Sequence, residues 1–233
     1  MIRLIVDGES RMLEPEVLIV AGYTGADVAA VEHHIAELAD EGVPPPPRVP
    51  MYWAMPPELL TQEPTIRMPG PRTSGEIELA LVVDGDDVFV TAGSDHTDRA
   101  AETIDIGLSK LACPTPLATE AWRWSEIADH WPDLGLRSEI DERGATVVYQ
   151  DDRAGVNRHP ADLLSGIPWS TSPRPACFVL LCGTVGCRGG IRPSDGFRGS
   201  ITDPLRDRTI ELRYRVDVIP QLTTEIVVSE TPE

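Results

Sequence analysis

The segment from Arg72 to Arg99 constrains the fold most strongly, because it combines an almost wholly apolar run with acidic residues near its ends. The run Ile77 to Val83 predicts a buried strand, and the Asp/Gly-rich residues 84–87 predict a hairpin turn. The following run, Val88 to Ala92, is the returning strand. We therefore expect a buried β-hairpin around which the rest of the chain is organised.

Acidic residues mark one end of this predicted hairpin. Glu76 and Glu78 are two residues apart, so their side chains face the same way on a strand. Two like charges next to buried surface either raise a pKa or need a cation between them. A simple register brings Asp95 to the same end, and an all-oxygen site suits Mg²⁺ or Mn²⁺ better than zinc or copper. The same spacing also fits the solvated face of an edge strand.

Length and charge limit the classes of function. The chain has 233 residues, 41% of them hydrophobic and 25% charged, which is enough for one substantial core without requiring a second domain. Its 20 basic and 38 acidic residues give a formal charge of -18. Such a charge repels phosphate backbones and anionic membranes. We expect neither nucleic acid nor a membrane as a partner.

The N-terminus and the cysteines indicate the compartment. The opening MIRLIVDGE is too short and too soon charged for a signal peptide, and no apolar run has the length of a membrane-spanning helix. We expect a cytoplasmic protein. Cys113, Cys177, Cys182 and Cys187 have the spacing of neither a zinc site nor a disulfide framework, which favours buried, reduced thiols.

The N-terminal part predicts two strands and one helix. Residues 1–6 and 15–21 predict strands joined by a polar turn, and apolar residues at helical spacing predict a helix from Ala26 that ends before Gly42. On this helix His34 borders the apolar stripe and Glu37 is its surface neighbour. An ordinary helical ion pair explains that spacing. The prolines at residues 44–47 predict a stiff linker.

The C-terminal part predicts further strands and two helices. The expected elements are a helix over 100–111, a hairpin of 136–140 with 145–150, a helix around 161–164, a central strand over 177–182 and an alternating strand over 209–218. Lys110 lies near the end of the first of these helices. A cation at a helix C-terminus is favoured by the helix dipole, so its position alone assigns it no chemistry.

Two motifs together resemble the fumarylacetoacetate hydrolase family. GEIELALVV followed by GSDHTDRA is similar to the family's Glu-x-Glu strand and its later Asp-x-Thr-x-Arg segment. The resemblance implies a metal site of Glu76, Glu78 and Asp95 that holds Mg²⁺ or Mn²⁺. It also implies that Arg99, which completes the second motif, contacts substrate. The separation between Glu78 and Asp95 is short for the family, so we expect a trimmed hairpin.

A third segment resembles the family's catalytic element. EHHIAEL is similar to its His-x-x-Glu motif, which follows a glycine-led loop. The resemblance implies that His34 is the general base and that Glu37 orients it, roles that suit a histidine beside a carboxylate. Lys110 matches a family lysine that faces the metal and binds the substrate's oxygen or carboxylate, and we count it with the catalytic residues.

Other segments resemble the walls of the family's substrate cleft. MYWAMPPELL is similar to a segment that begins with an aromatic pair, which implies that Tyr52 and Trp53 contact substrate, although packing in a proline-rich loop also explains them. The usual lysine of that segment is absent here. Thr184 matches the threonine of a Gly-Thr-Pro loop that contacts substrate, but Val185 replaces the proline.

The resemblance runs from about residue 22 to residue 218 and implies a mainly β (α+β) fold, a mixed rolled β-sheet with a few short helices, which usually forms homodimers. We expect one catalytic domain over 1–233, with N-terminal strands, helix and linker in 1–60, the metal-binding β core in 61–220 and a tail in 221–233. The implied substrate is a small 2-oxo acid or acylpyruvate, whose enolate the metal would stabilise.

Three functions stay open from the sequence. We favour hydrolysis of a C–C bond in an acylpyruvate-type substrate. The same site also fits an oxaloacetate-like decarboxylase or an isomerase or hydratase, because the family runs these reactions on one metal site. A catalytically inactive metal-binding relative is the remaining alternative, and the two departures in the cleft segments favour it. No Gly-x-Ser-x-Gly element supports a serine hydrolase.

Overall fold

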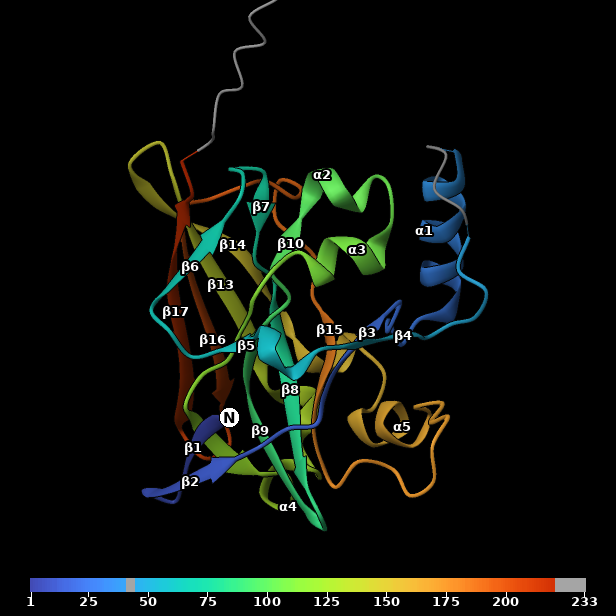
Figure 1. Cartoon of the computed structure of the whole chain (residues 1–233), viewed down its shortest axis with the longest axis vertical. Coiled ribbons are helices and arrows are strands. Elements are labelled where there is room, and N and C mark those ends of the chain that lie inside the picture. The colour runs from blue at the N-terminus through green and yellow to red at the C-terminus, as the bar shows by residue number, and fades with distance from the viewer. Residues whose placement is uncertain (41–44, 221–233) are drawn as a thin grey trace, which may run out of the picture.

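Two curved β-sheets form the framework of the protein (Figure 1). The computed structural model describes residues 1–40 and 45–220, without the side chains of His34 and residues 37–40. The larger sheet has eight strands in the order β2 (Glu9–Leu13), β1 (Ile2–Val6), β12 (Glu120–Arg123), β9 (Asp87–Ser94), β8 (Ile77–Asp84), β15 (Cys177–Thr184), β3 (Val17–Gly22) and β4 (Met51–Met55). It is mixed, because β1–β12 and β15–β3 pair in parallel and the other neighbours are antiparallel.

The second sheet has five strands, and two short ladders lie beside it. Its order is β14 (Ala145–Arg153), β13 (Gly135–Glu142), β16 (Gly196–Asp203), β17 (Arg208–Val218) and β6 (Thr65–Met68). The short ladders pair β10 (Thr97–Asp98) with β7 (Thr73–Ser74) and β11 (Thr115–Pro116) with β5 (Leu60–Thr61). The predicted hairpin of β13 and β14 is confirmed, with an irregular register between Ser138 and Glu139.

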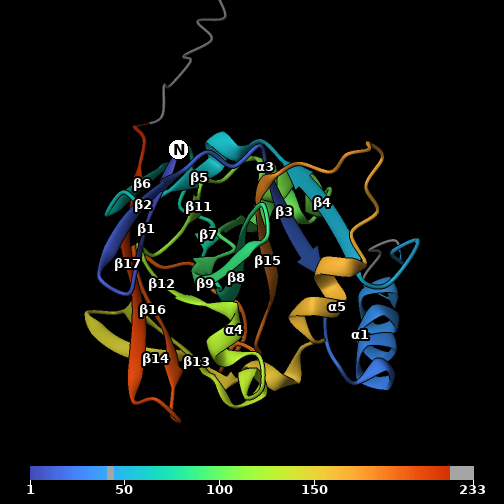
Figure 2. The same ribbon diagram turned by 90° about the horizontal axis from the view of Figure 1, so that it is seen from below.

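The helices are few and short. They are α1 (Val28–Asp40), α2 (Arg99–Glu102), α3 (Ile106–Leu111), α4 (Trp124–Ile127) and α5 (Pro160–Ser165), with single 3₁₀ turns at Pro57–Leu59, Trp131–Asp133 and Ala154–Val156. In both Figure 1 and Figure 2, α1 and α5 lie on the side of β3 and β4, away from the five-stranded sheet. The predicted mainly β fold is confirmed. Within the described residues, no helix is long and apolar enough to cross a membrane.

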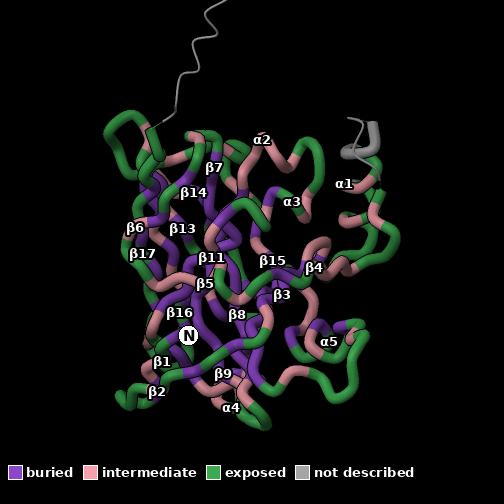
Figure 3. The backbone as a smooth tube through the Cα atoms, viewed as in Figure 1, coloured by how far each residue is buried: buried purple, intermediate pink, exposed green. Residues whose placement is uncertain are grey.

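The central hairpin of β8 and β9 is buried on both faces (Figure 3). Leu79 and Leu81 belong to the core cluster that also contains Ile201 of the second sheet, whereas Ala80 and Val82 belong to a second cluster on the other face. Burial on both faces explains why the run is continuously apolar instead of alternating. The strand is therefore central, and the alternative of a solvated edge strand is wrong.

Three local predictions need correction. The polar turn predicted after β1 contains strand β2, because Asp7 and Gly8 take positive φ and form a tight hairpin turn. The MYWAM segment is not a loop but edge strand β4, paired with β3. The helix predicted over 100–111 is two helices. Asp105 interrupts it, because its side chain accepts the Leu108 N–H and caps α3.

The predicted reduced thiols agree with the structure in most respects. All four cysteines are free, and three are buried, whereas Cys187 is half-buried. Burial raises the pKa of Cys113 and Cys187 to about 12 and that of Cys177 to about 11. These thiols therefore stay protonated and are poor nucleophiles at neutral pH.

Candidate functional site

The central hairpin brings the three predicted carboxylates to one end of the large sheet. Glu78 pairs with Gly93 in the β8–β9 register, and the N–H of Asp95 donates to the carbonyl of Glu76 over 3.0 Å. Glu78 lies on β8, Glu76 directly precedes this strand and Asp95 directly follows β9, so all three lie at the same buried end of the hairpin. Glu76 is 9% exposed, Glu78 2% and Asp95 5%.

These carboxylates line a cleft of about 550 Å³. Its wall is built from the end of β3 and the loop to α1, from Trp53 on β4, from α2 and α3, and from the loop after β15. The cleft brings together six of the residues singled out from the sequence, namely Trp53, Glu76, Glu78, Asp95, Lys110 and Thr184. Segments far apart in the chain therefore meet around the carboxylates.

Each carboxylate has a different partner. The backbone N–H of Gly183 donates to Glu78 Oε2 over 2.7 Å, and Arg99 Nη2 lies 3.1 Å from Glu76 Oε2. The Lys110 ammonium pairs directly with Asp95 Oδ2. Arg99 does not line the cleft but lies behind Glu76, where it also binds Ser74 Oγ. In this position Arg99 holds the carboxylate of Glu76, and its predicted contact with substrate stays a prediction.

The electrostatics of the cleft are unbalanced. Burial, followed by the negative charge of Asp95, raises the pKa of Glu78 well above its usual value, and Lys110 and the Gly183 N–H offset this only in part. Burial disfavours the charged form of Lys110, but Asp95 beside it outweighs burial and raises the lysine's pKa. Lys110 therefore stays a cation, whereas Glu78 takes up a proton more readily than an ordinary glutamate.

The donor set fits a hard divalent cation chemically. Three buried carboxylates supply oxygen ligands, and the charge of an ion among them would oppose the effects of burial and of Asp95, which together raise the Glu78 pKa. In the described part of the chain, no three Asp, Glu, His or Cys side chains already converge as a metal site. Lys110 is paired with Asp95 and Arg99 with Glu76. An ion would therefore compete with Lys110 for Asp95 Oδ2 and with Arg99 for Glu76 Oε2.

Gln150 holds the threonine of the cleft in place. Its amide nitrogen donates to Thr184 Oγ1 over 2.8 Å and to the carbonyl of Val185 over 2.7 Å, while its oxygen accepts the N–H of Ile77 over 2.9 Å. Thr184 in turn donates to the carbonyl of Ile77 over 2.9 Å. The fully buried Gln150 thus ties the β15 loop to the start of strand β8.

A second polar pair in the cleft has no counterpart in the sequence predictions. The Thr24 hydroxyl donates to Asn157 Oδ1 over 3.0 Å, and Asn157 Nδ2 donates to the carbonyl of Thr184 over 2.9 Å. Gly183 has a φ of +95°, and a Cβ there would lie 1.7 Å from Thr24 Oγ1. Gly183 is therefore required twice, for its backbone conformation and for its close contact with Thr24. Only the positive φ has a sequence signal, which is the glycine itself.

The aromatic pair of β4 is divided between two faces of the sheet. Trp53 lines the cleft, with the Lys110 ammonium 5.7 Å from its ring centroid. Tyr52 points the other way, and its hydroxyl donates to the carbonyl of Leu163 over 2.9 Å. Because side chains alternate along a strand, only one of the two can face the cleft. Tyr52 packs against α5 instead of contacting the cleft.

The predicted catalytic pair lies on α1, beside the cleft. Asp27, Ala30 and Val31 at the start of this helix line the cavity. The side chains of His34 and Glu37 lie outside the described residues. Their predicted roles as base and orienting carboxylate stay predictions.

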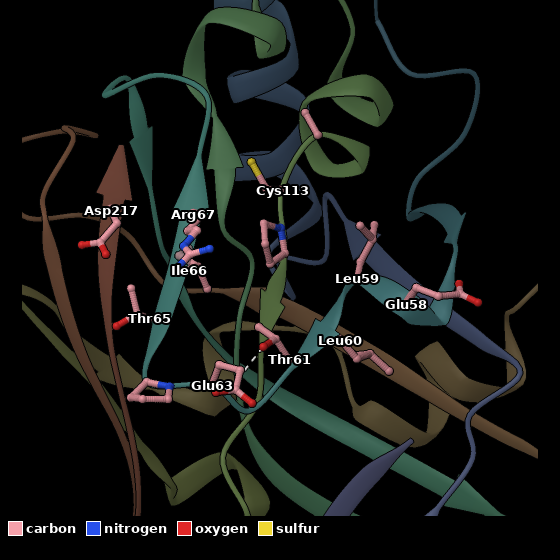
Figure 4. A pocket seen from close by; sticks show the side chains of 13 residues that line it. Glu58, Leu59, Leu60, Thr61, Glu63, Thr65, Ile66, Arg67, Cys113 and Asp217 are labelled. Carbon is pink, nitrogen blue, oxygen red and sulfur yellow. Dashed lines mark hydrogen bonds between the residues drawn. The ribbon is translucent and has the colours of Figure 1, made fainter. Parts of the chain in front are cut away.

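A wider hollow of about 820 Å³ lies elsewhere, around β5, β6 and the end of α3 (Figure 4). Its charged side chains, Glu58, Glu63, Arg67 and Asp217, are exposed and belong to different strands and turns. Cys113 also lines this hollow, but burial raises the pKa of its thiol to about 12, so it stays protonated and is a poor nucleophile. This hollow lacks the converging buried groups that distinguish the carboxylate cleft.

Comparison with solved structures identifies proteins of the same fold. Yeast ynq8, a fumarylacetoacetate hydrolase family protein, has a TM-score of 0.62 at 17% identity over 89% of this chain and 95% of its own. A 2-keto-3-deoxy-D-arabinonate dehydratase complexed with magnesium and 2,5-dioxopentanoate has a TM-score of 0.64 at 18% identity over 90% of this chain and 75% of its own. A putative isomerase from Escherichia coli has a TM-score of 0.63 at 13% identity over 92% of this chain and 99% of its own.

These likenesses support the predicted rolled β architecture of the fumarylacetoacetate hydrolase type. A search of curated proteins found no match. At the level of sequence, a family described as a protein of unknown function, DUF2848, matches residues 21–214, which include the central hairpin and the whole β15 loop. Because this match covers most of the chain, the protein belongs to the DUF2848 family of proteins of unknown function.

Proposed function

We propose that this protein is a Mg²⁺- or Mn²⁺-dependent enzyme that acts on small 2-oxo acids, and that it hydrolyses a C–C bond in an acylpyruvate-type substrate. The observation that carries the proposal is the cluster of Glu76, Glu78 and Asp95 beside Lys110 in one cleft. The fold agrees with the proposal, since one protein of the same fold is a dehydratase complexed with magnesium and a 2,5-dioxo acid.

Glu76, Glu78 and Asp95 would hold the ion. When bound, the ion would act as a Lewis acid toward the substrate's carboxylate and 2-oxo oxygens and stabilise negative charge that develops next to them. Arg99 and the Gly183 N–H orient two of the ligands, at Glu76 Oε2 and Glu78 Oε2 respectively. Such fixed partners keep carboxylates oriented in place.

Lys110 is the cation of the cleft. Released from Asp95, its ammonium would donate hydrogen bonds to a substrate oxygen or carboxylate and would balance negative charge formed there. The chain contains no other lysine, so no second ammonium from a side chain can replace it. Thr184, fixed by Gln150, presents a hydroxyl at the same place.

His34 and Glu37 would supply the proton transfer that hydrolysis needs. In this proposal His34 takes a proton from the attacking water and Glu37 orients the imidazole. The support is the similarity of the EHHIAEL segment to the family motif and the position of α1 at the cleft wall.

A lyase or isomerase reaction is the second candidate. It is favoured by the named activity of a protein of the same fold, a dehydratase, which performs no hydrolysis. The two candidates differ in their products. A hydrolase gives pyruvate and a carboxylic acid from an acylpyruvate, a decarboxylase gives CO₂, and a dehydratase releases water without breaking a C–C bond.

Turnover tests the proposal directly. The chelator-stripped protein is incubated with acylpyruvates, oxaloacetate and 2-oxo-3-deoxy sugar acids, with and without Mg²⁺ or Mn²⁺, and products are identified by mass spectrometry. We expect metal-dependent turnover that Glu76→Gln reduces at least about 100-fold. Asp129→Asn, in the turn after α4, is the matched control. Absence of turnover with every substrate, or turnover that a chelator leaves unchanged, contradicts the proposal.

A further inference from the structure

The cleft has two chemically different regions. The carboxylates and Lys110 are its buried end, since Glu78 is 2% exposed and the Lys110 side chain 10%. The more exposed lining includes five apolar or aromatic side chains, Tyr23, Val31, Trp53, Ile106 and Val156, and also the acids Asp27 and Glu102. A 2-oxo acid whose polar head is held at the buried end therefore has its tail against an apolar surface.

Trp53 is fixed as part of this apolar surface. A Cβ on Gly22 would lie 2.6 Å from its ring, and a Cβ on Gly107 would lie 3.0 Å from its Cδ1. Both glycines leave the space that the indole occupies, so the ring is held between the end of β3 and α3. A large aromatic ring with a restricted orientation offers a flat apolar contact to a ligand at low entropic cost.

Tyr23 reinforces the same wall. Its φ is +57°, a conformation that non-glycine residues seldom adopt. Burial, followed by the charge of Glu102, raises the pKa of its phenol, which therefore stays neutral. The tail region thus has a second aromatic ring and gains no charge from it.

The ionisable groups around the cleft oppose a second carboxylate on the ligand. Among the described residues, the lining contains Asp27, Glu76, Glu78, Asp95 and Glu102 but only one cation, Lys110, which is paired with Asp95. Arg99 lies outside the lining and forms ion pairs with Glu76 and Glu102. Asp27 has no arginine or lysine partner among these residues and accepts the N–H of Ala30.

On the basis of the proposed function, we infer that the cleft selects 2-oxo acids with an uncharged, apolar tail and rejects those whose tail ends in a second carboxylate. Trp53 supplies the apolar contact, and Asp27, whose charge no arginine or lysine of the described residues pairs with, supplies the repulsion. The selectivity thus comes from residues other than the proposed metal ligands, and it can be measured as binding without turnover.

A matched pair of ligands tests the inference. Calorimetric titration in Mg²⁺ compares 2-oxohexanoate with 2-oxoadipate, which have the same head and six carbons, and uses oxalate as a probe of the head site alone. We expect 2-oxohexanoate to bind at least about tenfold more tightly than 2-oxoadipate. If oxalate binds in its own titration but 2-oxoadipate binds as tightly as 2-oxohexanoate or more tightly, the inference is overturned and the proposed function stands. Failure of all three ligands to bind overturns both.

Variants test which residues set the selectivity. Asp27→Asn removes a charge but keeps a side chain that can cap α1. It should reduce the ratio of the affinities for 2-oxohexanoate and 2-oxoadipate about threefold or more. Glu58→Gln, which neutralises an acid in the hollow of Figure 4, is the control and should leave the preference unchanged. An unchanged preference in Asp27→Asn contradicts the assigned repulsion.

Trp53→Ala should weaken 2-oxohexanoate binding about tenfold, and oxalate binding much less. Gly107→Ala provides a second test that leaves the tryptophan in place, because its new Cβ forces the ring to shift while alanine favours the helix. It should reduce the preference for the apolar tail in a folded protein. Equal losses for oxalate and 2-oxohexanoate in both variants contradict the role of Trp53.

Discussion

The carboxylate cleft and the surroundings of Asp203 both bury acidic side chains beside cations, with opposite electrostatic results. Asp203 is fully buried at the end of β16, where Arg208 Nε lies 3.1 Å from one carboxylate oxygen and His130 Nε2 lies 3.0 Å from the other. The N–H groups of Leu205 and Arg206 also donate to it. Burial raises the pKa of Asp203, but these hydrogen bonds, led by that from Arg208, outweigh burial and lower it.

In the cleft the balance is reversed. Glu78 receives one backbone N–H, and its pKa lies well above its usual value because burial and Asp95 outweigh Lys110. A carboxylate saturated with donors, such as Asp203, is what folding requires of a buried charge. A carboxylate left undersatisfied costs stability, which is typical of sites where a ligand completes the neutralisation. The comparison therefore separates an acid whose charge is fully paired, Asp203, from one that is incompletely paired, Glu78.

The largest expected effect comes from breaking the structural cluster. Arg208 contacts Asp203, Glu126 and the Trp122 ring, whose centroid lies 4.4 Å from its guanidinium carbon. Arg208→Ala leaves Asp203 buried without its main partner and should lower the free energy of unfolding by about 3 kcal/mol. Urea unfolding measures this change. A loss below about 1 kcal/mol would mean that the cluster does not stabilise the fold.

The pH dependence of Asp203 sharpens the comparison. Because its folded pKa is lowered, the unfolded state binds more protons between the ordinary value, about 3.9, and the folded one. Its stabilisation is therefore complete above the ordinary pKa and is lost as pH falls through the folded pKa. Asp203→Asn should destabilise the protein by about 2 kcal/mol at pH 7, and the difference from wild type should shrink below about pH 4. Urea unfolding at pH 7, 5 and 3 measures it, and a constant difference would be inconsistent with this account.

A substitution in the cleft should act in the opposite direction. Glu78→Gln removes a destabilising charge and keeps an oxygen for the Gly183 N–H, so the metal-free protein should gain about 1 kcal/mol. The same change should weaken Mg²⁺ binding. Thermal unfolding with and without Mg²⁺ reports both effects, with the exposed Glu63→Gln as control. A destabilised metal-free variant would show that the cleft carboxylate is structural, like Asp203.

An exposed ion pair should have the smallest effect. Arg198 and Asp141 are 2.7 Å apart at the surface of the second sheet, with side chains 40% and 42% exposed. Arg198→Ala should change the free energy of unfolding by no more than about 0.5 kcal/mol, because water screens the pair. Urea unfolding tests this. A loss of stability comparable to that of Arg208→Ala would show that the contribution of an ion pair to stability in this protein depends on its geometry and not on its burial.

The central hairpin was predictable because its signals are local. A continuous apolar run, an Asp/Gly turn and the alternation of Glu76 and Glu78 together specify strands, register and side-chain direction. The same local logic predicted the central strand β15 and the helix after His159, whose side chain caps α5.

Features that depend on distant segments were not predictable. The opposite directions of Tyr52 and Trp53 required knowing that their segment is a strand, and the proline-rich flanks favoured a loop. Asn157 reaches the cleft through its contact with Thr184 of the β15 loop, which lies 27 residues away in sequence. The Asp203 cluster joins segments up to 82 residues apart, and no spacing pattern announces it.

Metal binding to the cleft is the central claim, and calorimetric titration tests it most directly. The chelator-stripped protein is titrated with Mg²⁺ and Mn²⁺, with and without oxalate, which mimics the head of a 2-oxo acid enolate. We predict binding that oxalate tightens about tenfold or more, that Glu78→Ala abolishes and that Asp203→Asn preserves. Absence of binding under every condition, or equal binding in Glu78→Ala, would contradict the assignment of the cleft as a metal-dependent active site.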